Sequence, residues 1–102
     1  MELNEYMNLA STTAIYKNPK LQIDPLAYVA LGLAGEAGEF ANKVKKMFRD
    51  REWSKEALAE ELGDVLWYLS QCCKELDLDF DTVASQNINK VQKRYRVTTT
   101  TG

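Results

Sequence analysis

The chain has 102 residues, of which 45% are hydrophobic and 27% charged, with a formal net charge of −2. This composition is typical of one globular domain, and the slightly acidic balance argues against nucleic acid as a partner. No apolar run is long enough to span a membrane and no signal peptide is recognisable, so we expect a cytoplasmic protein without a membrane partner.

Helical periodicity continues through most of the chain, and N-cap residues mark where three helices begin. Asp24 precedes a proline, and Ser54 and Asp79 each precede a helical pattern. The predicted helices cover residues 2–16, 25–50, 54–76 and 79–95, each to within a few residues. We expect one domain over residues 1–96 and a disordered tail over residues 97–102.

The short connections favour antiparallel neighbours, so the predicted fold class is all-α, with a four-helix bundle-like protomer. The segment Val65–Leu69 of the third helix is apolar around nearly its whole circumference. Such a helix needs cover on more than one side, which a monomer of this length hardly provides. We therefore expect a homodimer or homotetramer. Cys72 and Cys73 are adjacent in this helix and are expected to be reduced.

The chain contains no histidine. Serine–histidine and cysteine–histidine nucleophile pairs, histidine-ligated zinc and acid–base catalysis by histidine are therefore excluded. The sequence also lacks a Walker phosphate loop and a dinucleotide-binding glycine fingerprint. Any catalysis has to come from carboxylates, amines, hydroxyl groups or a bound metal ion.

Two pairs of acids stand at helical i, i+3 spacing, Glu36 with Glu39 and Glu61 with Asp64, separated by residues 40–60. In each helix the first acid lies about 70° and the second about 130° from the centre of the apolar stripe. All four acids thus border the predicted core. One such pair is a common surface pattern, but two matching pairs favour a single shared site.

Clustered carboxylates repel one another, and a hard divalent cation removes that repulsion. Ligands that are all oxygen suit Mg²⁺, with Mn²⁺ as a substitute. Glycines inside helices cost about 1 kcal/mol each relative to alanine, which suggests that a helix or ligand approaches them closely. Here they are Gly32, Gly35, Gly38 and Gly63.

The stretch Glu36-Ala-Gly-Glu39, followed after 21 residues (40–60) by Glu61-Leu-Gly-Asp64, resembles the E-x-x-E…E-x-x-D signature of MazG-like nucleotide pyrophosphohydrolases. These belong to the all-alpha NTP pyrophosphatase superfamily. The resemblance implies Mg²⁺-dependent hydrolysis of a nucleoside triphosphate to the monophosphate and pyrophosphate, as in cleaning of nucleotide pools. It also implies that Glu36, Glu39, Glu61 and Asp64 are the metal ligands and the catalytic residues.

The resemblance further suggests which residues bind the substrate. Asn87 and Lys90 match the family's phosphate-contacting segment, and Tyr68 matches an aromatic residue that stacks on the base. Three positively charged side chains elsewhere in the chain are further candidates for binding the phosphates, although lysines near helix C-termini are ordinary surface residues. They are Lys43, Lys46 and Arg94.

Two alternatives stay open at this point. One is a hydrolase of the same fold with another substrate, either phosphoribosyl-ATP or strictly dUTP or dCTP. The other is a helical interaction module without turnover, against which the presence of all four acids argues. Base and sugar preference and the number of metal ions are not readable from the sequence.

Overall fold

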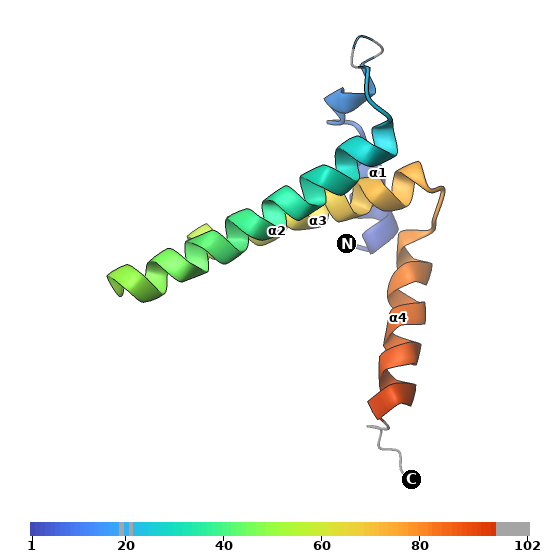
Figure 1. Ribbon diagram of the computed structural model, residues 1–102. Helices are drawn as coiled ribbons and strands as arrows, with labels where there is room; N and C mark the ends of the chain where they lie inside the picture. The colour runs from blue at the N-terminus through green and yellow to red at the C-terminus, as the bar shows by residue number, and fades with distance from the viewer. Residues whose placement is uncertain (19, 21, 96–102) are drawn as a thin grey trace.

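Two long antiparallel helices, α2 (Pro25–Asp50) and α3 (Lys55–Glu75), lie side by side and form the body of the molecule (Figure 1). The computed structural model describes residues 1–18, 20 and 22–95, so the predicted tail over residues 97–102 lies outside the described residues. Within those ranges every regular element is helical, which confirms the all-α prediction with four α-helices. None of the described helices is long and apolar enough to cross a membrane.

The predicted N-caps are confirmed by hydrogen bonds to the first backbone amides of the helices. The Asp24 carboxylate accepts from the amides of Leu26 and Ala27 at 2.8 and 3.1 Å, and Pro25 takes the first helical position. The Ser54 hydroxyl accepts from the amide of Ala57 at 3.1 Å. Asp24 thus fixes the start of α2, and Ser54 fixes the point where the loop after α2 ends and α3 begins.

The first helix is shorter than predicted. Helix α1 covers Leu3–Ser11, and a 3₁₀ turn, η1 (Ile15–Lys17), replaces its predicted last turn. The hydroxyls of Ser11, Thr12 and Thr13 donate to backbone carbonyls three or four residues earlier, at 2.7–2.8 Å. Such side-chain bonds offer the backbone an alternative to helix continuation, which explains the early end.

Helix α4 (Phe80–Tyr95) departs from the bundle that the sequence predicted. It packs against α1 and the end of α3, makes no contact with α2, and projects away from the α2–α3 pair (Figure 1). Its first turn is fixed by Asn4, whose amide donates to Asp79 and Asp81 at 2.7 and 2.8 Å and accepts from the Phe80 amide at 2.8 Å. The chain is consequently open, with a radius of gyration of 16.8 Å against about 13 Å for a compact domain of this length.

The small apolar core lies where α1, α3 and the start of α4 meet. Met7, Cys73 and Phe80 are buried there and are surrounded by partly buried apolar side chains. Cys72 and Cys73 are both free thiols, as predicted.

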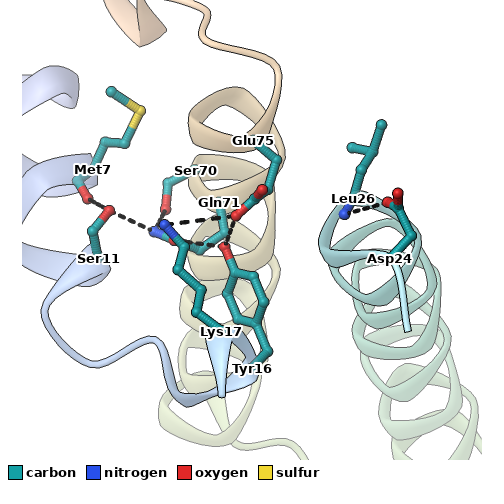
Figure 2. A network of polar contacts seen from close by, with 9 residues as sticks. All are labelled: Met7, Ser11, Tyr16, Lys17, Asp24, Leu26, Ser70, Gln71 and Glu75. Atoms are coloured by element: carbon teal, nitrogen blue, oxygen red, sulfur yellow. Dashed lines mark hydrogen bonds and ion pairs between the residues drawn. The ribbon is translucent and has the colours of Figure 1, made fainter. Parts of the chain in front are cut away.

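A buried polar network joins α1 and η1 to α3 (Figure 2). The Tyr16 hydroxyl donates to Glu75 at 2.7 Å and lies 3.1 Å from the side-chain oxygen of Gln71. The amide of the fully buried Gln71 donates in turn to the hydroxyls of Ser11 and Ser70 at 3.3 Å. The end of α1 and η1 are thereby held against the last two turns of α3.

We expect Tyr16→Phe to lower the free energy of unfolding by about 1–3 kcal/mol, because it removes the buried hydroxyl that bonds to Glu75 and lies beside the side-chain oxygen of Gln71. Chemical denaturation followed by circular dichroism measures this. The control is Tyr95→Phe. Because Tyr95 is exposed, this variant should have the same free energy of unfolding as the wild type. Equal stability of Tyr16→Phe and the wild type would show that the network does not stabilise the fold.

Candidate functional site

Three of the four predicted carboxylates meet between α2 and α3. One oxygen atom from each of Glu36, Glu61 and Asp64 lies within 4.8 Å of the other two. Glu36 comes from the middle of α2, and the other two come from successive turns of α3. Because the helices run antiparallel, Glu36 of α2 comes to face the i, i+3 pair of α3.

Glu39, the fourth predicted ligand, is exposed and does not belong to this group of three. It lies one turn beyond Glu36 on α2, and its negative charge is among those that raise the pKa of Glu36. Its role as a metal ligand stays a prediction.

The cluster is electrostatically unfavourable as it stands. Burial, followed by the charges of Asp64 and Glu61, raises the pKa of Glu36 above the ordinary glutamate value. Burial and the charge of Asp64 also raise the pKa of Tyr6, which lies on α1. A site where acids disfavour each other's ionisation gains free energy from any cation placed among them.

Glu61 carries the clearest sign of a missing partner. Its Oε1 atom forms an ion pair with Lys43 at 3.1 Å, whereas its Oε2 atom is buried and has no hydrogen-bond partner among the residues that the structure describes. Buried polar atoms are nearly always paired, so an orphaned carboxylate oxygen beside two other carboxylates fits a cation ligand. The donor set is entirely oxygen, which suits Mg²⁺ or Mn²⁺.

An open pocket of about 380 Å³ adjoins the carboxylates. Tyr68 and Trp67 line it from α3, and their rings meet edge to face with centroids 5.0 Å apart. The Trp67 indole N–H donates to the hydroxyl of Thr13 at 3.0 Å, which fixes the indole to the segment between α1 and η1. Glu36 and Asp64 line the same pocket. The pocket thus places aromatic surface directly beside negative charge.

The sequence predicts Tyr68 as a substrate-binding residue, but it does not predict Thr13 or Trp67. Trp67 follows Asp64 by three positions and so shares its helix face, a signal that was available. Thr13 lies outside any helix, and no sequence signal placed it opposite α3.

The remaining predicted substrate-binding residues lie apart from the carboxylates, except Lys43. Lys46 lines a separate depression of about 270 Å³ near the α2–α3 loop. Asn87 and Lys90 line a groove of about 330 Å³ on α4, which does not contact α2. The guanidinium of Arg94, in the last turn of α4, lies 6.0 Å from the ring centroid of Tyr95. Within one protomer, the structure therefore does not bring the α4 residues to the site.

The helix glycines also differ from expectation. A Cβ atom added at Gly35, Gly38 or Gly63 would meet nothing within 4 Å among the described residues. Only Gly32 is closely approached, by the ring of Tyr68. The glycines are therefore not a general sign of close packing around the acids within one chain.

Comparison with known proteins agrees with this geometry. A family model described as the MazG nucleotide pyrophosphohydrolase domain matches residues 26–98, a range that contains all four predicted acids. The chain is also 45% identical over 101 residues to the "Gene 37 protein" of Mycobacterium phage L5, covering 92% of this chain and 89% of that protein. No solved structure matches it significantly.

Proposed function

Because the chain belongs to the family of MazG nucleotide pyrophosphohydrolase domains, we propose that it hydrolyses a nucleoside or deoxynucleoside triphosphate to the monophosphate and pyrophosphate. The observation that carries the proposal is the group of three carboxylates from α2 and α3, with the buried, unpartnered oxygen of Glu61. Such an activity would suit the removal of unwanted nucleoside triphosphates from the nucleotide pool.

Glu36, Glu61 and Asp64 would hold Mg²⁺, or Mn²⁺ in its place, and Glu39 is the proposed fourth ligand. A bound divalent ion supplies charge neutralisation and polarisation of the phosphates. The chain's own residues orient the substrate and move the proton. With no histidine in the chain, a carboxylate of the cluster is the proposed acceptor of the proton from the attacking water.

The pocket beside the cluster supports the orientation of the substrate. Triphosphate oxygens would lie toward the carboxylates and their metal, while the base lies against Tyr68 and Trp67. Aromatic rings favour flat, apolar partners such as bases. Lys43, already at the cluster through Glu61, is placed to add positive charge toward the phosphates.

We expect Glu36→Gln and Asp64→Asn each to abolish pyrophosphate release, because each removes a proposed metal ligand without changing side-chain volume. Circular dichroism should show an unchanged helical fold, since the substitutions relieve the repulsion that raises the pKa of Glu36. The assay is pyrophosphate release with Mg²⁺ from the common and modified nucleoside triphosphates and from phosphoribosyl-ATP.

The matched control is Glu52→Gln, which changes an exposed acid in the loop between α2 and α3. Wild-type turnover in both cluster variants would refute the mechanism. If the wild type released pyrophosphate from none of these substrates, the non-catalytic interaction module would be the better interpretation.

We further propose that the active form is a homodimer or homotetramer. The accessible surface is 7514 Å², against about 5,800 Å² expected for a compact monomer of 11.6 kDa. The excess is larger than the ~800 Å² that one partner contributes to a standard interface. Three leucines along α3 and at its C-terminal cap are exposed, namely Leu62, Leu69 and Leu76.

An oligomer also gives the α4 residues a route to the cluster. Because α4 does not contact α2 in its own chain, Asn87 and Lys90 could act on the phosphates only when α4 comes from a second chain. We therefore propose that these two residues, with Arg94 as a weaker candidate, serve the partner's carboxylate cluster.

Subunit mixing tests this arrangement. Glu36→Gln and Lys90→Ala chains, each nearly inactive alone, should recover about a quarter of wild-type activity after refolding together, because half of the dimers then contain one intact site. The measurement is pyrophosphate release after mixing in equal amounts. Mixtures of Glu36→Gln with Asp64→Asn chains are the control and should stay inactive, since both lesions lie in the same cluster. If Lys90→Ala is inactive alone but its mixture with Glu36→Gln recovers no pyrophosphate release, a site shared between chains is contradicted.

A further inference from the structure

Gly32 and Tyr68 make the closest approach between α2 and α3 at any helix glycine of the described chain. A Cβ atom added at Gly32 would lie 2.5 Å from Cδ1 and 2.6 Å from Cζ of Tyr68. These distances are well inside the ~3.5 Å contact distance of two carbon atoms. The Tyr68 ring therefore lies where any larger side chain at position 32 would be.

Both residues lie one turn from the carboxylates. Gly32 precedes Glu36 by four positions on α2, and Tyr68 follows Asp64 by four positions on α3. Burial, with smaller effects from the neighbouring Tyr28 and Glu36, raises the pKa of Tyr68. The ring itself lies against α2 at Gly32.

The position of this ring sets the size of the pocket. Trp67 meets Tyr68 edge to face on one side and is itself tied to Thr13. If a side chain at position 32 displaced the Tyr68 ring from α2, the open pocket that Tyr68 lines offers the free space to receive it. The displaced ring would fill space beside Glu36 and Asp64.

We propose that Gly32 is a positioning residue that acts through Tyr68: its missing Cβ lets the ring lie against α2 and keeps the pocket beside the carboxylates open to a flat, base-sized group. The identity of that group as a nucleobase rests on the proposed function. The positioning of the ring does not, because it follows from the Gly32–Tyr68 contact alone.

The test compares Gly32→Ala with Gly38→Ala, a matched control on the same helix with open space around the added Cβ. Both variants gain helix propensity, so only the contact with Tyr68 distinguishes them. With the best nucleoside triphosphate and saturating Mg²⁺, we expect Gly32→Ala to raise KM about tenfold and to leave kcat within about twofold. This pattern indicates the loss of an interaction that stabilises the bound substrate and the transition state equally. Gly38→Ala should match the wild type.

A second comparison uses Tyr68→Ala, in which no ring remains to be displaced. Adding Gly32→Ala to that variant should cause no further rise in KM, whereas independent effects would multiply. An unchanged KM in Gly32→Ala, or the same rise with and without the Tyr68 ring, would overturn the proposal.

A readout without substrate separates this inference from the proposed function. In NMR spectra of the ligand-free protein, the Tyr68 ring protons should show contacts to the α protons of residue 32 in the wild type and in Gly38→Ala, and lose them in Gly32→Ala. A ring that keeps these contacts in Gly32→Ala overturns the positioning role. If the wild type releases no pyrophosphate from any nucleotide, the proposed function fails while the NMR comparison still decides the positioning role.

Discussion

Repulsion among Glu36, Glu61 and Asp64 is the constraint around which α2 and α3 are paired. The helix pairing places three carboxylate oxygens within 4.8 Å of each other, and Lys43 offsets part of their charge through its ion pair with Glu61. That lysine satisfies one oxygen of Glu61 and leaves the other buried without a partner. A divalent cation held among these acids, as we propose, would remove that repulsion.

The rest of the protomer supports one wall of that site. The buried network of Gln71 holds the segment between α1 and η1 against α3, and this segment carries Thr13, the hydrogen-bond partner of Trp67. Stability of the α1–α3 contact is therefore linked to the shape of the pocket beside the carboxylates. Helix α4 takes no part in that wall, since Asn4 fixes its first turn to α1 and the remainder extends away.

Features that depend on local spacing were predictable from the sequence, and features that depend on tertiary contacts were not. The N-caps at Asp24 and Ser54 follow from rules that act within one turn, and they agree with the structure. Of the two i, i+3 pairs of acids, three members meet in the structure and Glu39 does not join them. The direction of α4 depends on Asn4, 75 residues before Asp79, which no periodicity reveals. The exposed leucines of α3 show a further limit, because an apolar stripe does not say whether its cover comes from the same chain or from another.

The central claim is that the α2–α3 carboxylates form a divalent metal site. Titration of the protein with Mn²⁺, followed by electron paramagnetic resonance of the free ion, tests it without requiring turnover or knowledge of the substrate. The account predicts saturable binding by the wild type that is lost in Glu61→Gln, because Glu61 contributes the buried oxygen without a partner. Equal Mn²⁺ binding by the wild type and Glu61→Gln, or no binding by either, would contradict it.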